Sequence, residues 1–161
     1  MSGLSYHYWI LIAPFLVLLT QCASRPPPAP PKPAPIVTIS VTGSADQNPD
    51  INGAPSPVAV RIIELTGTGT FESADVFALL DHQQQTLGAE EAGTREFIIS
   101  PSEHRSVTID PKPGVTAIGL AALYRDIDNA RWRTVAPIAG DGPTNLVAGI
   151  GKLAVTLTAS P

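Results

Sequence analysis

Cys22 is the residue of this 161-residue chain whose type and position most clearly indicate chemistry. It is the only cysteine, so it cannot form a disulfide within the chain, and a metal site or a redox pair would need companions. It follows an apolar run from Trp9 to Leu19, which is shorter than the ~20 residues of a transmembrane helix and has the length of a signal-peptide core. The pattern predicts export, acylation of the Cys22 thiol and cleavage just before that residue.

Two features of this signal depart from the usual pattern. Residues 1–8 contain neither Lys nor Arg, and Gln21 stands where signals of this kind usually place Gly, Ala or Ser. The alternative interpretations are an ordinary secretory signal that leaves Cys22 as a free thiol, or a membrane-anchored start of the chain. Asp just after the cysteine commonly marks inner-membrane retention in Gram-negative lipoproteins. Because Ala23 and Ser24 stand there instead, the pattern favours the outer membrane.

We divide the chain into a signal peptide at residues 1–21, a lipidated cysteine with its tether at residues 22–35, and one folded domain at residues 36–161. Residues 25–35 are mostly proline, which fixes φ and lacks a backbone donor. This segment is therefore predicted to be a polyproline II spacer that rises ~3.1 Å per residue and spans about 30 Å. Such a spacer would hold the domain away from the lipid. The alternative is a ligand for a proline-binding domain.

The domain shows no residue pattern typical of catalysis, cofactor binding or metal binding. His82 and His104 are isolated from other metal-ligating residues, and no nucleophile elbow, phosphate loop or dinucleotide fingerprint is present. Asp126, Asp128 and Asn129 resemble part of a calcium loop, but the residues after them lack the oxygen ligands of an EF-hand. With a net charge of −4, a pI of about 5.2 and no basic block, the chain is not expected to bind nucleic acid. We predict neither an enzyme nor a bound cofactor or metal.

Hydrophobic alternation with a period of two runs through most of the domain and predicts β-strands. In the first strand Val37, Ile39 and Val41 share one face, whereas residues 115–124 are almost wholly apolar, as in a central strand covered on both sides. The predicted strands are 36–42, 58–65, 96–100, 106–110, 115–124, 131–135 and 153–158. Because Gly, Pro, Asn and Asp separate these segments, we predict a mainly β fold, an antiparallel β-sandwich.

One segment between the second and third predicted strands breaks this rhythm. Ser73 is positioned to cap a helix over residues 74–81, and Asp75 near its start suits the helix dipole. A second short helix is expected at residues 82–87. The buried stripe of the first helix is predicted to be Val76, Leu79 and Leu80, with Phe77 beside them. The sandwich is thus expected to carry a small helical insertion whose apolar stripe packs onto it.

A charged segment links the predicted strands at 115–124 and 131–135. Asp128 and Asn129 favour a turn within it. Its Arg and Asp side chains are predicted to form a charged lattice across a hairpin, with a tryptophan anchored in the core. The residues assigned a structural role here are Tyr124, Arg125, Asp126, Trp132 and Arg133, and Arg131 completes the lattice.

Residues 43–57 connect the first two predicted strands and are long for a hairpin connection, where about two to five residues are typical. The loop combines Asn, Asp and Pro with one isolated apolar residue, Ile51. Extended loops on rigid scaffolds often bind partners, which makes this segment the candidate binding element. The alternative is a surface loop that takes no part in binding.

The order of the motifs along the chain resembles that of the TssJ lipoproteins of the bacterial type VI secretion system. After the lipidation cysteine, a first strand and a polar loop, the strongest similarities are residues 57–65 (PVAVRIIEL) and 117–128 (AIGLAALYRDID). Smaller similarities follow the same order at Phe71, Ala74-Asp75, Phe77, Leu87-Gly88, Pro101, Ala130 and Trp132-Arg133. Together they cover nearly the whole mature chain. The departures are Gln21 and Ser102, where the family often has Gly.

This resemblance implies a transthyretin-like β-sandwich with an added helical element. It also implies an outer-membrane lipoprotein, anchored by its lipid on the periplasmic face. Such a protein binds the periplasmic C-terminal domain of the inner-membrane protein TssM, and through TssM it is linked indirectly to TssL. In the family, the loop between the first two strands contributes to TssM binding. Here that loop is residues 43–57, and since it has no strict motif to carry over residue by residue, the expectation falls on the region. Within it, the residues expected to contact TssM are Asp46, Asn48, Asp50, Ile51 and Asn52.

Two other classes of protein remain as alternatives. A periplasmic lipoprotein with the same β-sandwich fold could bind a small ligand, although no residue pattern indicates a pocket. An envelope hydrolase would need a Ser, Cys or metal constellation, which the sequence lacks.

Overall fold

A computed structural model of the protein describes residues 31–160. The predicted signal peptide, Cys22 and the first part of the predicted tether lie outside the described residues. The strands are β1 (Ile36–Gly43), β2 (Val58–Leu65), β3 (Glu91–Ile99), β4 (His104–Ile109), β5 (Ala117–Ala122), β6 (Arg133–Pro137), β7 (Pro143–Ile150) and β8 (Val155–Ala159). The helices are α1 (Gly69–Ser73), α2 (Val76–Asp81) and α3 (Gln83–Leu87), with 3-10 helices η1 (Gly88–Glu90) and η2 (Ile127–Asn129).

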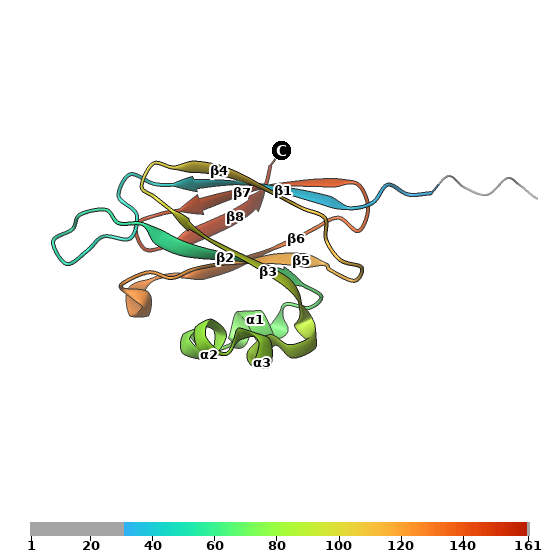
Figure 1. The fold of residues 1–161 in the computed structure, drawn as a ribbon, viewed down its shortest axis with the longest axis horizontal. Coiled ribbons are helices and arrows are strands. Elements are labelled where there is room, and N and C mark those ends of the chain that lie inside the picture. Colours follow the sequence, from blue (N-terminus) through green and yellow to red (C-terminus); the bar gives the residue numbers. More distant parts are fainter. Residues whose placement is uncertain (1–30, 161) are drawn as a thin grey trace, which may run out of the picture. The chain divides into compact units, whose positions relative to one another are not determined.

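The strands form two four-stranded sheets that face each other (Figure 1). One sheet has the order β4-β1-β7-β8, and the other has the order β3-β2-β5-β6. Neighbouring strands are antiparallel except for β1 and β7, which pair in parallel from Ile36 and Pro143 to Gly43 and Ile150. The predicted mainly β sandwich is therefore confirmed, with one parallel pair that the sequence did not indicate.

Strand β7 lies outside the predicted strands. It buries Leu146, Ala148 and Ile150, but its other positions include Asn145 and Gly149, so small and polar residues weaken its hydrophobic alternation. Strand β2 keeps its predicted limits, whereas β1, β4, β5, β6 and β8 differ from the prediction by one or two residues at an end. Strand β3 differs most: it begins at residue 91 instead of 96, and residues 91–95 lack the hydrophobic alternation that predicts a strand. Strand β8 begins at residue 155 instead of 153.

The main hydrophobic core lies between the two sheets. Val37, Ile39 and Val41 of β1 point into it, as the alternation predicts, and each is at most 1% exposed. Strand β5 is buried along its whole length, which agrees with its predicted central place. The reason is that β5 lies between β2 and β6 and has the core on one face and helices on the other.

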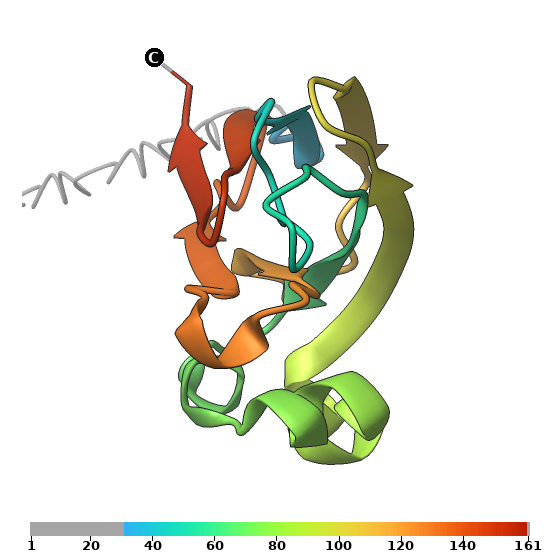
Figure 2. The same cartoon turned by 90° about the vertical axis from the view of Figure 1, so that its left-hand side faces the viewer.

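The three α-helices cover the outer face of the β3-β2-β5-β6 sheet (Figures 1 and 2). The apolar residues between helices and sheet are Ile63, Leu65, Phe71, Leu79, Leu87 and Ala117. Phe71 is fully buried over Gly119, where an added Cβ would lie 3.0 Å from the Phe71 ring. The predicted helical insertion between the second and third strands is thus present. No helix in residues 31–160 has the length and apolar character needed to cross a membrane.

The first predicted helix has different limits in the structure. Asp75, and not Ser73, caps α2, because its carboxylate accepts hydrogen bonds from the Phe77 and Ala78 N–H groups. Ser73 ends the preceding helix instead. In the predicted stripe, Leu79 is buried but Phe77 is 57% exposed. A helix of six residues makes fewer than two turns of ~3.6 residues, so it directs few side chains at the sheet.

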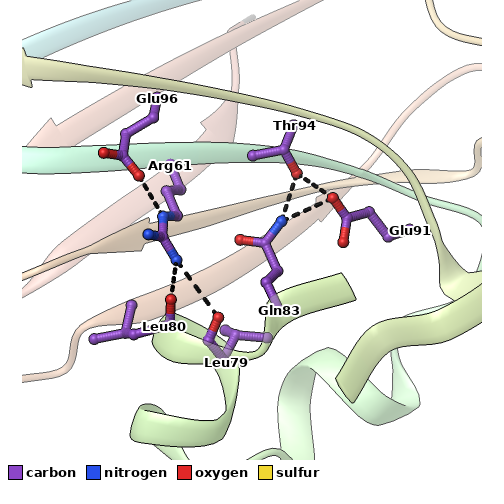
Figure 3. Close-up of polar contacts among 7 residues, drawn as sticks. All are labelled: Arg61, Leu79, Leu80, Gln83, Glu91, Thr94 and Glu96. Carbon is purple, nitrogen blue, oxygen red and sulfur yellow. Dashed lines mark hydrogen bonds and ion pairs between the residues drawn. The ribbon is translucent and has the colours of Figure 1, made fainter. Parts of the chain in front are cut away.

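Polar side chains also hold the helices against the sheet (Figure 3). Arg61 of β2 pairs with Glu96 of β3 and donates hydrogen bonds to the carbonyls of Leu79 and Leu80 in α2. This guanidinium therefore supplies donors to carbonyls near the helix end, where intrahelical partners are lacking. A second anchor is the group of hydrogen bonds among Gln83, Glu91 and Thr94.

Candidate functional site

The loop between β1 and β2, residues 44–57, lies at one end of the sandwich (Figure 1). The last residues of the predicted tether lie at the other end of β1. There the Gly142 N–H donates to the Pro33 carbonyl at 3.1 Å, and Lys32 forms an ion pair with Asp141 at 2.8 Å. Strand β1 thus separates the tether from the loop by its full length.

The tip of the loop is a tight turn organised by Asp50. Its carboxylate accepts hydrogen bonds from the Asn52 and Ala54 N–H groups, both at 2.8 Å. The Asp50 N–H in turn donates to the Ala54 carbonyl. Gly53 closes the turn with a φ of 82°, which glycine adopts without strain. This fixed backbone presents the Ile51 side chain to solvent, where it is fully exposed.

The base of the loop is buried. The side chain of Gln47 is inaccessible to solvent and donates to the carbonyls of Ile99 at 2.8 Å and Ser56 at 3.3 Å. Gly43 leaves room for this amide, because a Cβ at that position would overlap the Gln47 side-chain oxygen. Asn48 follows, and only 2% of it is exposed. The loop is therefore attached to the sandwich by polar side chains that point inward.

Asn48 connects this loop to two others at the same end of the sandwich. Its backbone N–H donates to the Lys152 carbonyl at 3.0 Å, in the turn between β7 and β8. Its side-chain oxygen accepts from the Arg125 N–H at 2.9 Å, in the segment between β5 and β6. Its side-chain nitrogen donates to the Pro57 carbonyl at 2.8 Å. Figure 2 faces this end and shows the three loops next to one another.

The five loop residues expected to contact a partner have different environments. Asp46, Ile51 and Asn52 are exposed, Asp50 is partly buried, and Asn48 is buried. Four of them are therefore accessible to a partner. The side chain of Asn48 is directed into the protein.

The charged segment between β5 and β6 lies beside the loop. Tyr124 is buried, its hydroxyl donates to the Gly151 carbonyl at 3.1 Å, and burial raises the pKa of this hydroxyl to about 12. Trp132 packs against the core between the two sheets and also against the apolar residues between the helices and the sheet. Arg125 and Asp126 are exposed. The segment thus combines two aromatic residues that pack in the protein with two charged residues at its surface.

The charged lattice predicted across this segment is not formed. No ion pair in residues 31–160 links the four charged residues assigned to it. Arg133 extends instead to the helical layer, where it donates to the carbonyls of Phe71 and Ala74, and it lies 4.7 Å from the Trp132 ring. The cause is again the end of a short helix, whose carbonyls need donors. Burial away from water lowers the pKa of Arg133.

A surface depression of about 630 Å³ lies next to the loop tip. Residues of all three loops line it: Pro49, Asp50, Ile51, Arg125, Asp126 and Leu153. Leu153 falls within the last predicted strand, and no sequence signal places it here. Its position beside the loop depends on the parallel pairing of β1 with β7.

This end of the sandwich has the composition of a protein-contact surface. An exposed apolar side chain, Ile51, stands among charged groups, and protein interfaces combine an apolar centre with a polar rim in this way. The described residues contain no group of three or more His, Cys, Asp or Glu side chains arranged to hold a metal ion.

The fold and the site define a two-sheet β-sandwich with a helical layer on one sheet and a structured loop at one end. The chain matches the family model described as "Type VI secretion lipoprotein, VasD, EvfM, TssJ, VC_A0113" over residues 35–159. It belongs to this family, and the predicted resemblance is confirmed. No curated protein sequence matched the chain.

Solved structures share the fold. The crystal structure of the T6SS lipoprotein TssJ1 from Pseudomonas aeruginosa is 32% identical, with a TM-score of 0.76 over 81% of this chain and 98% of that chain. Serratia marcescens Lip, a membrane-bound component of the type VI secretion system, is 18% identical, with a TM-score of 0.69 over 80% and 99%. A chain in the structure described as T6SS protein TssM C-terminal domain (869-1107) from EAEC is 22% identical, with a TM-score of 0.62 over 78% and 98%.

Proposed function

We propose that this protein binds the periplasmic C-terminal domain of TssM and tethers the type VI secretion membrane complex to the outer membrane. The observation that carries the proposal is the fixed, fully exposed Ile51 beside the depression lined by Arg125 and Asp126. An apolar side chain within a polar surround is a typical interface anchor. The proposed role is binding alone, with no catalytic step and no small-molecule substrate, and the link to TssL runs through TssM.

The proposed membrane anchor is an acylated Cys22, which lies outside the described residues. In this proposal residues 1–21 are removed as a signal peptide, residues 22–35 carry the lipid and the tether, and residues 36–161 form the domain. A single acyl chain binds a bilayer only marginally, whereas two or more hold a protein stably. Membership of a family described as type VI secretion lipoproteins supports this part of the proposal.

The geometry of the domain suits a tethered adaptor. Strand β1 has eight residues and spans about 26 Å at ~3.3 Å per residue. The tether meets the domain at one end of this strand and the loop stands at the other, so a lipid anchor would leave the loop directed away from the lipid. The structure described as T6SS protein TssM C-terminal domain (869-1107) from EAEC contains a chain with the same fold as this one, which supports TssM as the proposed partner.

Titration calorimetry with the mature chain and the periplasmic C-terminal domain of the TssM encoded in the same genome tests the proposal. We expect saturable one-to-one binding. Ile51→Asp should raise the Kd at least about tenfold, or about 1.4 kcal/mol, because it places a charge where an apolar side chain becomes buried. Ile36→Asp is the matched control, since Ile36 is another exposed isoleucine, at the opposite end of β1.

Comparison of the wild-type chain with the Ile51 and Ile36 variants distinguishes three outcomes. Weak binding by the Ile51 variant together with normal binding by the Ile36 variant supports the loop as the contact. Equal affinity of the Ile51 variant and the wild type would place the TssM site elsewhere on the domain. A folded wild-type chain that does not bind TssM would reject the adaptor role.

A further inference from the structure

The three loops at the proposed binding end of the sandwich meet at one residue. Asn48 bonds through its backbone N–H to the β7–β8 turn at Lys152, and through its side-chain oxygen to the N–H of Arg125. Its side-chain nitrogen bonds to Pro57, where its own loop returns to the sheet. These contacts join segments that lie far apart in the chain, and no other side chain in residues 31–160 makes recorded hydrogen bonds to both the 44–57 loop and the 123–132 segment.

The backbone of Asn48 is as specific as its side chain. Its φ of 43° lies in the left-handed region, which Asn and Gly adopt more readily than other residues. The side chain must also donate at one end and accept at the other, which an amide does and a carboxylate does not. Because the residue is 2% exposed, water does not compete for these hydrogen bonds. Position 48 therefore demands both the backbone conformation and the amide of asparagine.

The residues that follow Asn48 are those that present the binding surface. Pro49, Asp50 and Ile51 line the depression on one side, and Arg125 and Asp126 line it on the other. The hydrogen bond from the Arg125 N–H to the Asn48 side chain fixes the distance between these two sides. Without it, the two would be linked only indirectly, through the β7–β8 turn, to which the Asn48 N–H and the Tyr124 hydroxyl both bond. The ordering of one loop against the other would then be an added entropic cost of binding.

We propose that Asn48 is a positioning residue for partner binding: it does not contact TssM but locks the 44–57 loop to the 123–132 segment, so that TssM meets one preformed composite surface. This inference rests on the proposed function. It assigns to Asn48 a role other than the direct contact expected from the family resemblance. It also makes Arg125 and Asp126 part of the surface that TssM recognises.

Asn48→Gly tests the inference, because glycine keeps the left-handed backbone and the N–H to Lys152 while it removes both side-chain hydrogen bonds. Ser102→Gly is the matched control. Ser102 is the other residue besides glycine in the described chain with a positive φ, 63°, and it lies exposed in the β3–β4 turn. The two variants relieve the same kind of backbone constraint, so their difference isolates the Asn48 amide.

Hydrogen exchange and calorimetry are then measured on the mature wild-type chain and on both variants. In Asn48→Gly we expect the Arg125 amide and the amides of residues 50–54 and 56 to exchange at least about tenfold faster, with β1 and β5 amides unchanged. We expect its Kd for the TssM domain to rise at least about tenfold, while Ser102→Gly stays within about twofold of the wild type. A role in overall stability alone would change strand and loop amides together, and that result would overturn the inference.

Other outcomes also decide between the proposals. If Ile51→Asp weakens binding but Asn48→Gly does not, the positioning role is wrong and the proposed function stands. If the wild-type chain does not bind TssM, both fail. Should Asn48→Gly not fold, Asn48→Ala provides the same comparison, since it also removes both side-chain hydrogen bonds, and Ser102→Ala is then its control at a positive φ. An unchanged Kd in that variant would likewise overturn the inference.

Discussion

At the scale of single residues, Tyr124 shows how burial near the proposed binding end affects a titratable group. It lies on the β3-β2-β5-β6 side of the core, and its hydroxyl donates to Gly151, which follows β7 of the other sheet. Burial of the ring and hydroxyl disfavours the phenolate, which raises the pKa from 10 to about 12. The folded chain therefore keeps a proton that the unfolded chain loses in this range.

This shift predicts a loss of stability in alkaline solution. The stabilisation is fully present below pH 10 and decreases as the pH rises from 10 towards 12, by roughly 2 to 3 kcal/mol for a shift of about two units. Urea unfolding of the mature chain across this range measures the effect, and Tyr124→Phe should reduce its slope. Tyr124 is the only tyrosine after residue 8, so tyrosinate absorbance reports this group directly. Native absorbance that titrates at the ordinary tyrosine pKa would contradict the prediction.

The candidate site could be predicted from the sequence only in part. The length and polarity of the 43–57 segment indicate a binding loop, and Ile51 is its one isolated apolar residue. The place of Asn48 could not be predicted, because its partners Arg125 and Lys152 are far away in the chain and approach it only through the sheet pairing. An Asn in a polar loop has the same sequence signature whether it faces solvent or the protein.

At the scale of elements, two arginines in one row of the sheet hold the helical layer. Arg61 of β2 and Arg133 of β6 both pair with Ala121 of β5, one on each side of it. Each donates to carbonyl groups at the end of a short helix, α2 for Arg61 and α1 for Arg133. Helices of five and six residues are not stable alone, so these contacts and the apolar cluster fix them.

Arg61→Met is predicted to loosen this layer. Hydrogen bonds to a charged group contribute about 1.5 to 3 kcal/mol, and the loss should lie in that range because the Arg61 side chain is only 19% exposed. Urea unfolding gives the magnitude, and faster amide exchange confined to residues 76–87 gives the location. Arg95→Met serves as the control, because Arg95 is exposed and makes one hydrogen bond, to the Thr108 carbonyl. Equal effects of the two substitutions would contradict the proposed anchoring.

The elements differ in how well the sequence predicts them. Strands with clear alternation, such as β1, and the wholly apolar β5 follow from local pattern. Strand β7 does not, because its stability comes from pairing with β1 and β8 and not from its own composition. Ser73 and Asp75 are both good capping residues, so the local pattern could not decide between them, and in the structure Asp75 accepts the cap hydrogen bonds of α2.

At the scale of the whole domain, the sheet topology brings together the three loops at the proposed binding end. Because β1 and β7 are parallel and in register, Gly43 and Ile150 end side by side, and the 44–57 loop starts next to the β7–β8 turn. Strand β5 is antiparallel to β2, so it ends at Ala122 where β2 begins, beside the return of the same loop. The one parallel pair is thus what makes a composite surface of loops possible.

Cys22→Ser tests how far the function of this surface depends on the anchor. Confinement by a lipid raises the local concentration of the domain, so a modest affinity for TssM can hold the assembly. We expect Cys22→Ser to lose palmitate labelling and leave the membrane fraction, while its domain keeps the wild-type urea unfolding curve. Because this is the only cysteine, no second thiol can accept the lipid. Ser24→Ala, two residues away, should keep the label and the membrane location. Labelling that persists in Cys22→Ser would reject the anchor, whereas loss of the anchor with unchanged assembly of the complex in cells would show that affinity for TssM alone is sufficient.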